Sequence, residues 1–490
     1  MTTFRLLLSI VLPLVALLGG CASRPINPPI KEIHADQGYR FANRHQEAND
    51  PETLLILTFS GGGTRAAAFS YGVLEALRRT EAVGPTGRTF RLIDQVDAIT
   101  GVSGGSFTAL AYGLYGDRLF GEYEQRFLKR NVQGELVTRL LSPGNWGALS
   151  SATWGRSEMA AQLYDEILFN GATYADLTRG NGPLVMVMAT DITTGSRIGF
   201  TQPMFDVMCS DLDAVPLSRA AATSSAVPLV MSPVTFNNYG GSCNFRPPAW
   251  ATAATDPDNP ARPAARAMKR MEEIRSYEHG QDRPYVHLVD GGLADNLGMR
   301  AVIEMLEEFE AIRSRGIKTP LDNMKRIVVI VVNSLSVPRA DWDRHETPPG
   351  SMDILIKATG VPIDRYSYES VELLRDIVAR WNLMSAIRNS PAFDGSKDPS
   401  LAHVMNAPAT QLYAIDVSFP LLKDRAEFEY LNDLPTSFVL PSEAVDRLRA
   451  AAGALLLQSP DFQRLMKDTG ARIVDRPAAS PGPLPSAGAD

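Results

Sequence analysis

Short runs of apolar residues, each about the length of one β-strand, end in glycine-rich turns that lead into helical patterns. The clearest is Leu54–Phe59, which is followed by Gly61-Gly62-Gly63 and then by a helical pattern. A continuous apolar run is typical of a strand buried on both faces, as in a parallel sheet. Strands that alternate with helices predict an α/β fold with a mainly parallel central sheet flanked by helices. Further strands are expected at 92–100, 183–189, 285–290, 326–332 and 411–417.

The turn after the second expected strand places a serine between glycines, as Gly101-Val102-Ser103-Gly104-Gly105. The pattern Gly-x-Ser-x-Gly is typical of a nucleophile elbow, in which a serine occupies a sharp strand-to-helix bend and its neighbours must be almost free of side chains. The hydroxyl then lies at a helix N-terminus, where backbone N–H groups stabilise negative charge. Taken alone, the pentapeptide is equally typical of a glycine turn that packs a strand on a helix.

The three successive glycines at 61–63 leave several backbone N–H groups unobstructed and able to converge on an anion. The loop lacks the Gly-Lys-Ser/Thr ending of a nucleotide-binding P-loop. Ala66 also breaks the dinucleotide pattern Gly-x-Gly-x-x-Gly. With a P-loop and a dinucleotide-binding loop set aside, the glycine loop is predicted to form an oxyanion hole.

Three motifs occur in this order along the chain: the glycine loop with Arg65, the elbow at Ser103, and the turn Asp290-Gly291-Gly292. This order resembles that of the patatin-like phospholipase family, over about residues 53–300. Two weaker similarities are Asp191 within Thr-Asp-Ile-Thr-Thr-Gly, and the sequence Thr-Ser-Ser-Ala-Val-Pro at 223–228. Ala66 departs from the glycine that usually follows the loop arginine.

The resemblance implies a three-layer α/β/α fold and a lipid acyl hydrolase of the phospholipase A or lysophospholipase type, with acyl transfer as an alternative. In this family Ser103 and Asp290 would form a catalytic dyad in which the carboxylate removes the serine proton without a histidine. A carboxylate with a pKa of about 3.9 is a weak base, but partial burial raises that value. The implied oxyanion-hole donors are Gly61, Gly62, Gly63 and Gly104, and the implied supporting residues are Arg65, Gly101, Gly105, Gly291 and Gly292.

Two other readings stay open. A Ser-His-Asp triad would draw its histidine from His345 or His403, which follow Asp290 in the chain. His287 is an unsuitable partner, because a residue three positions before Asp290 on one strand faces the other side of the sheet. The second alternative is a non-catalytic, lipid-tethered binding protein. Arg65 would orient the glycine loop, meet a lipid phosphate, or pair with a surface carboxylate.

The N-terminus is typical of a secretion signal, with a basic start and an apolar stretch at Leu6–Leu18 that is too short to span a bilayer. Leu18-Gly-Gly-Cys21 resembles a bacterial lipobox, which implies a lipoprotein signal peptide at 1–20 and lipid chains on Cys21. Ala22 in place of aspartate implies the outer membrane, facing the periplasm of the cell envelope. An ordinary signal peptide with an incidental cysteine is the alternative. Residues 21–52 are polar and proline-containing, which indicates a linker to the folded body.

Cys209 and Cys243 form one disulfide in an oxidising periplasm or remain two buried thiols. No His or Cys spacing indicates a metal site, and no cofactor is expected. The formal net charge of −7 and ordinary composition give no sign of nucleic-acid binding. The expected partners are a lipid substrate and the membrane.

The expected organisation is a catalytic core at 53–335 that carries a Pro/Ala-rich inserted loop at about 240–283, with a short charged helix near 265–278. Residues 336–475 are expected to be a mostly helical part packed on this core. Residues 476–490, rich in proline and alanine, are expected to be disordered.

Overall fold

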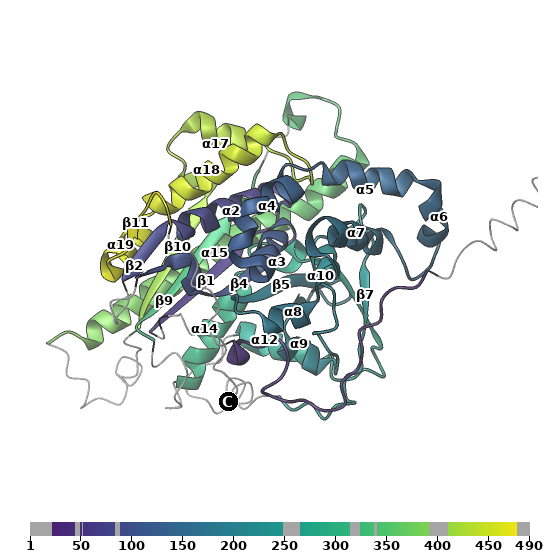
Figure 1. The fold of residues 1–490 in the computed structure, drawn as a ribbon, viewed down its shortest axis with the longest axis horizontal. Coiled ribbons are helices and arrows are strands. Elements are labelled where there is room, and N and C mark those ends of the chain that lie inside the picture. The colour runs from purple at the N-terminus through teal and green to yellow at the C-terminus, as the bar shows by residue number, and fades with distance from the viewer. Residues whose placement is uncertain are drawn as a thin grey trace, which may run out of the picture.

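A central sheet runs through the computed structural model and separates two layers of helices (Figure 1). The structure describes residues 22–44, 50, 52–83, 89–247, 265–313, 324–337, 341–391 and 410–477. Cys21 therefore lies outside the described residues, and so does the expected tail at 476–490 apart from its first two residues.

The sheet is mainly parallel, as the sequence predicts, and its order is β10-β9-β1-β4-β5-β8-β7, with β6 also paired to β5. The five parallel strands are β1 (Thr53–Phe59), β4 (Val96–Val102), β5 (Leu184–Asp191), β9 (Arg326–Asn333) and β10 (Gln411–Ser418). Three strands at the other end pair in antiparallel fashion, namely β6 (Arg197–Gly199), β7 (Val234–Asn237) and β8 (Tyr285–Asp290). A separate small sheet contains β2 (Thr80–Val83), β3 (Thr89–Arg91) and β11 (Arg472–Ile473).

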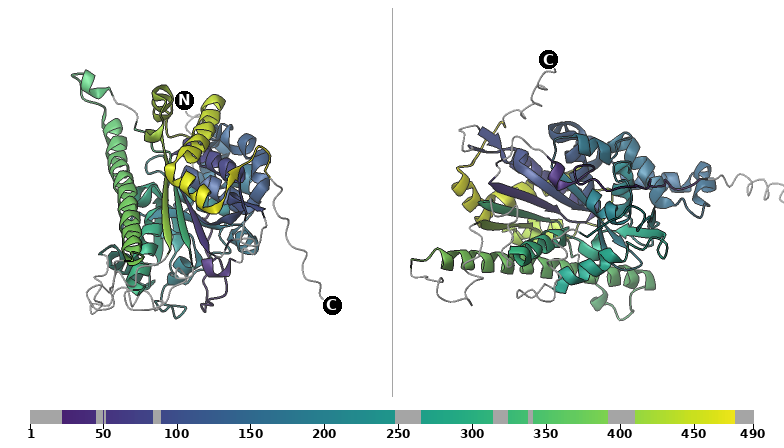
Figure 2. Two further views of the ribbon diagram at one scale, coloured as in Figure 1. Left: turned by 90° about the vertical axis from the view of Figure 1, so that its left-hand side faces the viewer. Right: turned by 90° about the horizontal axis from the view of Figure 1, so that it is seen from below.

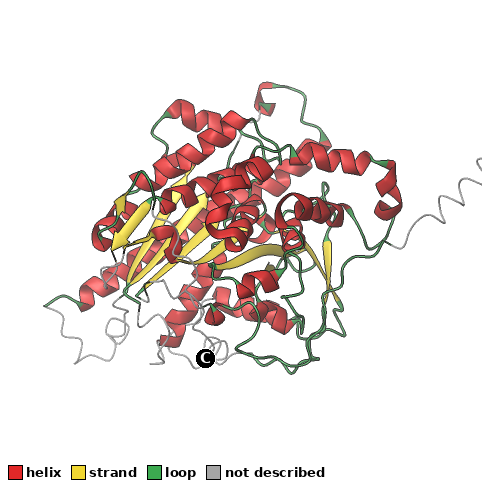
Figure 3. Ribbon diagram, viewed as in Figure 1, coloured by secondary structure: helices red, strands yellow, loops and turns green. Residues whose placement is uncertain are grey.

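Helices cover both faces of the central sheet, which confirms the predicted α/β class (Figure 3). On one face α2 (Gly63–Arg78) packs against α3 (Gly104–Tyr115) and α18 (Ser442–Gln458). The long helix α15 (Ser351–Arg388) lies on the opposite side of the sheet from α18 (Figure 2). Among the described residues, none of these helices is both long and apolar enough to cross a bilayer. The remaining α-helices are α4 (Leu119–Tyr123), α5 (Val132–Leu141), α6 (Pro143–Leu149), α7 (Arg156–Tyr164), α8 (Tyr174–Arg179), α9 (Gln202–Val207), α10 (Leu217–Ser224), α12 (Ala265–Arg275), α13 (Gly292–Asp295), α14 (Arg300–Arg313), α17 (Arg425–Asn432) and α19 (Pro460–Thr469).

The C-terminal part completes the core instead of resting on its outside. Strand β10 pairs with β9 in parallel along its full length, from Gln411 to Ser418. Helix α18 packs against α2, the helix that follows the glycine loop. The boundary expected at residue 335 therefore does not divide the sheet.

The segment before β1 differs from the predicted free linker. Asn27 and Tyr39 are buried, and the Tyr39 hydroxyl accepts a hydrogen bond of 2.6 Å from the Val185 N–H at the start of β5. The Ile30 N–H donates to the carbonyl of Cys209 at 2.9 Å. The sequence predicts a linker here, but groups of the described residues 22–44 hydrogen-bond to the body, at β5 and at Cys209.

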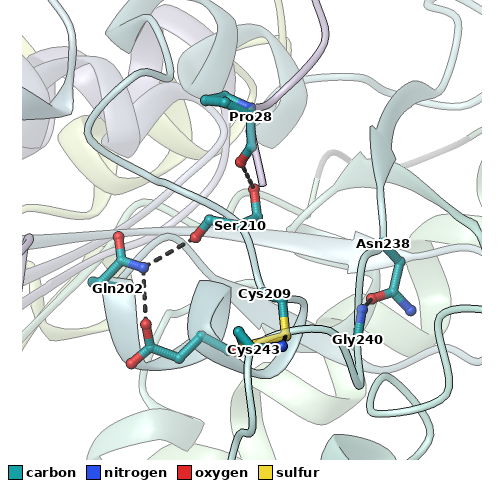
Figure 4. Close-up of a disulfide and its surroundings, with 8 residues drawn as sticks. Pro28, Gln202, Cys209, Ser210, Asn238, Gly240 and Cys243 are labelled. Carbon is teal, nitrogen blue, oxygen red and sulfur yellow. Dashed lines mark hydrogen bonds between the residues drawn. A yellow bond between two sulfur atoms is a disulfide. The ribbon is translucent and has the colours of Figure 1, made fainter. Parts of the chain in front are cut away.

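A disulfide joins Cys209 and Cys243, whose Cα atoms are 5.5 Å apart (Figure 4). Beside it, the Ser210 hydroxyl donates to the Pro28 carbonyl at 3.3 Å, and the Gln202 side chain donates to the Ser210 carbonyl at 3.0 Å. The cross-link thus lies directly under the docked N-terminal segment.

Replacing both Cys209 and Cys243 by serine should lower the free energy of unfolding. The bond spans 34 positions, and closing a loop of this size is worth about 4 kcal/mol in the chain-entropy model. We expect a loss of about 2 to 4 kcal/mol in urea denaturation without reductant. Dithiothreitol should bring the wild-type protein to the value of the double variant and leave that variant unchanged. Equal stability without reductant would contradict this assignment.

Candidate active site

Ser103 lies on the sharp bend between β4 and α3. Its backbone has φ 46° and ψ −119°, a conformation that a non-glycine residue adopts only under strain, and the residue is 6% exposed. A Cβ atom at Gly104 would lie 1.9 Å from the Gly63 carbonyl oxygen, and one at Gly105 would lie 2.6 Å from the Ser60 carbonyl oxygen. The two glycines are thus required by close backbone contact, as expected for an elbow.

A second serine holds this bend in place. The Ser103 N–H donates a 2.8 Å hydrogen bond to the Ser224 hydroxyl, which itself donates to the Met188 carbonyl of β5 at 2.6 Å. Ser224 ends α10 and belongs to the segment 223–228 that the sequence singled out only as a weak family similarity. Its anchoring role was missed, because the partner lies 121 positions away.

Asp290 reaches the same end of the sheet from the opposite direction. The sequence placed it at the carboxyl end of a strand in a mainly parallel sheet, but β8 runs antiparallel to β5. Val102 pairs with Met188 across β4 and β5, and the next residue, Ala189, pairs with Asp290 across β5 and β8. In the sheet, Asp290 is therefore level with the position of Ser103 itself, and β8 reaches that position in the antiparallel direction.

Burial and nearby hydrogen bonds act in opposite directions on the Asp290 carboxylate. The residue is 7% exposed, and desolvation raises its pKa to about 6. The Gly292 N–H, at 2.8 Å from Oδ1, and a hydrogen bond from the Ser103 side chain each favour the charged form and lower the pKa. The group is thus a buried base in hydrogen-bonding reach of the Ser103 hydroxyl.

The glycine loop borders Ser103, but its three amides are not equivalent. A Cβ atom at Gly61 would lie 3.4 Å from Ser103 Cβ, so the loop touches the elbow. The Gly61 N–H, however, donates to the Asn296 carbonyl at 2.9 Å and is not available to an oxyanion. The prediction that Gly61 is a donor is therefore wrong. Within the described residues, the N–H groups of Gly62, Gly63 and Gly104 have no hydrogen-bond partner.

Arg65 is buried and binds the protein itself. Its guanidinium donates to the carbonyls of Ser334 at 2.8 Å and Leu434 at 2.6 Å, and to the Thr436 hydroxyl at 3.1 Å. Burial lowers the pKa of Arg65 to about 10. Among the roles left open by the sequence, these contacts support orientation of the glycine loop, which Arg65 ties to the loops after β9 and before α18.

The described histidines do not bind the dyad. His287 is exposed and its Nδ1 atom lies 2.9 Å from the Thr235 hydroxyl, while His345 is exposed and contacts Asp341. His403 lies outside the described residues. Among the residues that the structure describes, no group of three or more His, Cys, Asp or Glu side chains could hold a metal ion.

Asp191, the other motif carboxylate, has a structural role. It is fully buried, and it accepts hydrogen bonds from the Arg283 guanidinium at 2.6 Å and the Tyr277 hydroxyl at 2.8 Å. Desolvation opposes its charge, but the hydrogen bonds prevail and its pKa is lowered. Asp191 secures the turn after β5. By contrast, no cationic side chain contributes to the pKa shift of Asp290.

Replacing Asp290 by asparagine should stabilise the protein in a pH-dependent way. The native pKa of about 6 exceeds the ordinary 3.8, so the native state binds the proton more tightly and this stabilisation is lost as pH rises from about 4 through 6. Asparagine has no such loss. In urea denaturation, the stability difference between Asp290→Asn and wild type should grow by about 3 kcal/mol between pH 4 and pH 8. A difference that is constant with pH would refute this.

Replacing Ser224 by alanine should loosen the elbow, because the Ser103 N–H and the Met188 carbonyl both lose a buried partner, at about 1 to 3 kcal/mol for each. We expect labelling of Ser103 by a fluorophosphonate to slow by about tenfold with the circular dichroism spectrum preserved. The matched control is Ser225→Ala, whose hydroxyl donates within α10 to the Ala221 carbonyl at 2.8 Å. Equal labelling rates in the two variants would count against the anchoring role.

Comparison with solved structures finds human GIVD cytosolic phospholipase A2, at 12% identity and a TM-score of 0.44, with 92% of this chain and 69% of that chain covered. Its complex with methyl gamma-linolenyl fluorophosphonate matches at 13% identity and a TM-score of 0.39, with 86% and 59% covered. VipD from Legionella pneumophila matches at 10% identity and a TM-score of 0.27, with 94% and 74% covered. No curated protein matches the sequence significantly. The family model described as patatin-like phospholipase matches residues 57–303, just over half of the 490 residues, and the chain belongs to this family.

Proposed function

We propose that this chain is a serine lipid acyl hydrolase that cleaves the carboxylic esters of membrane lipids through Ser103 and Asp290. The observation that carries the proposal is the buried Asp290 carboxylate in hydrogen-bonding reach of Ser103. Membership of the phospholipase family supports a lipid ester as the substrate. An enzyme of the phospholipase A or lysophospholipase type fits both.

Asp290 is the general base in this mechanism. As Ser103 Oγ attacks the ester carbonyl carbon, its proton passes to the Asp290 carboxylate. With a pKa of about 6, Asp290 is mostly ionised at neutral pH and is a stronger base than an exposed aspartate. The proton then passes from Asp290 to the departing alcohol, and an acyl-serine remains.

The oxyanion of the tetrahedral intermediate is assigned to the unpaired amides of Gly62, Gly63 and Gly104. Gly63 and Gly104 begin α2 and α3, so both helix termini favour negative charge at this point. Loss of one such donor costs about 3 kcal/mol of transition-state stabilisation. Water then attacks the acyl-serine as it gives a proton to Asp290, and Asp290 returns this proton to Ser103 Oγ as the fatty acid is released.

The proposal includes a lipid anchor on Cys21, in the outer membrane and facing the periplasm. The lipobox-like sequence Leu18-Gly-Gly-Cys21 and the Cys209–Cys243 disulfide both suit an envelope protein. Two or more acyl chains hold a protein to a membrane stably, whereas one chain is marginal. The substrate would then lie in the membrane that carries the enzyme.

The dyad predicts that Ser103→Ala and Asp290→Asn each reduce hydrolysis of a water-soluble short-chain ester by at least about a thousandfold. His345→Ala should stay within about twofold of wild type, because this histidine is exposed and contacts Asp341. The wild-type kcat/KM should rise with pH and level off above about 6, as Asp290 loses its proton. Failure of a fluorophosphonate to label Ser103 in the folded protein would instead favour a non-catalytic binding protein.

A further inference from the structure

Two surface segments near the active site expose apolar side chains and lack charge. Residues 140–155 and 220–238 contain no Asp, Glu, Lys or Arg. Six apolar side chains of α5, α6 and the loop after α10 are between 40% and 66% exposed; five lie in these two segments, and Val137 lies just before the first, between Glu135 and Arg139. We call them the apolar rim, and they are Val137, Leu141, Trp146, Val227, Leu229 and Val230.

Backbone hydrogen bonds connect the loop at 227–230 to Asp290 directly, and connect α5 to the glycine loop through Ser437 and Phe438. The Ala226 carbonyl accepts the Asp290 N–H at 3.0 Å, and the exposed residues 227–230 follow directly. On the other side, the Ser437 carbonyl accepts the Thr64 N–H of the glycine loop at 2.8 Å, and the next residue, Phe438, accepts the Gln133 N–H of α5 at 3.2 Å. The apolar side chains therefore lie on the two elements that lead outward from the dyad.

A hydrogen bond joins residues that follow the two halves of the rim in sequence. The Ser232 hydroxyl, just after the loop 227–230, accepts a hydrogen bond of 3.1 Å from the Ser157 N–H at the start of α7. Helix α7 follows α6, which carries Trp146, so the segments are linked side by side. Figure 1 shows α5, α6, α7 and β7 together at one end of the molecule.

The N-terminal segment arrives at this same end. The Ala22 carbonyl, next in sequence to Cys21, accepts a hydrogen bond of 2.6 Å from the Ser151 hydroxyl in the loop after α6. Arg24 donates to the Thr235 carbonyl of β7 at 3.1 Å and lies over the Tyr285 ring. A lipid on Cys21 would thus begin one residue from the loop that links α6 to α7.

We propose that the apolar rim docks into the surface of the lipid bilayer and presents the mouth of the active site to its substrate. The inference rests on the proposed lipid hydrolase function and on the position of Ala22, the residue that follows the proposed lipid anchor. Uncharged apolar side chains gain by entering the acyl region, and a net charge of −7 gives no attraction to anionic lipids. Docking should accordingly depend little on salt.

Fluorescence quenching tests the contact directly. The full chain, with its N-terminal segment, is placed in phosphatidylcholine vesicles that contain brominated phosphatidylcholine. Of the five tryptophans, Trp146 is exposed, Trp342 is half-buried, Trp154 and Trp381 are buried, and Trp250 lies outside the described residues, so the variant Trp146→Phe is needed to assign the quenched emission to Trp146. Trp146→Phe should lose at least about half of the quenching. Salt at 1 M, where the Debye length is about 3 Å, should leave the quenching of the wild-type protein unchanged. Equal quenching in wild type and Trp146→Phe would overturn the docking of α6.

A matched pair of triple variants links docking to turnover. Leu141→Ser/Leu229→Ser/Val230→Ser changes the rim, and Leu355→Ser/Tyr368→Ser/Leu383→Ser changes equally exposed apolar side chains of α15. The rim variant should hydrolyse phosphatidylcholine vesicles at least about tenfold more slowly, yet hydrolyse a soluble short-chain ester within about twofold of wild type. The α15 variant should match wild type in both assays.

The outcomes separate the two proposals. Loss of vesicle hydrolysis in the α15 variant alone would overturn the rim as the docking surface, as would wild-type vesicle hydrolysis in the rim variant. If the wild-type protein hydrolyses neither substrate, the hydrolase function fails, and quenching of Trp146 still decides whether the rim enters a bilayer. Absence of quenching would instead favour a protein as the occupant of this surface and would overturn the inference.

Discussion

The active site depends on a direct contact between two stretches of backbone. Gly104, at the start of α3, lies so close to Gly63, at the start of α2, that a side chain at Gly104 would collide with the Gly63 carbonyl oxygen at 1.9 Å. The contact brings two helix N-termini together with Ser103 beside them, and it leaves unpaired amides on both. The Ser437 backbone also packs against Gly63, so the C-terminal part of the chain supports a loop that is 374 positions away. Glycine is required here by contact, because no rotamer change can relieve a collision between a Cβ atom and backbone.

The carboxylate is delivered by the antiparallel end of the sheet. Along β5, strand β8 pairs with the last three residues alone, and its last residue, Asp290, is one position beyond the level of Val102. The Asp290 and Gly291 N–H groups donate to the carbonyls of Ala226 and Ser224, at 3.0 and 3.2 Å. Ser224 also holds the Ser103 amide at 2.8 Å. One short segment at the end of α10 therefore fixes the backbone on both sides of the dyad, so the distance between nucleophile and base does not depend on long side chains.

The local chemistry of this site was predictable from sequence, whereas its long-range partners were not. Gly-x-Ser-x-Gly and the glycine loop follow from steric needs within a few residues, so spacing alone identifies them. The direction of β8 was not readable, because an apolar strand has the same pattern in either direction and the connection before it is long enough for both. The hydrogen-bond partners of the glycine-loop amides could not be predicted either, because nothing near Gly61 in sequence indicates that the Asn296 carbonyl accepts its N–H. The docked segment at 22–44 was taken for a linker because its polar groups bind loops far away in sequence.

A buried aspartate can serve where many hydrolases use histidine, because burial changes its proton affinity. The pKa of about 6 for Asp290 lies close to the value of about 6.5 for a free imidazole, so the carboxylate accepts and returns a proton in the same pH range. The opposing hydrogen bonds from Gly292 and Ser103 keep the pKa from rising further, which would leave the base protonated at neutral pH. The same desolvation destabilises the fold at neutral pH, since a charged group without a cationic partner is held out of water. The low stability at neutral pH and the high proton affinity of Asp290 therefore have one physical origin. Any change that hydrates Asp290 should raise the free energy of unfolding at neutral pH and lower the basicity of the carboxylate.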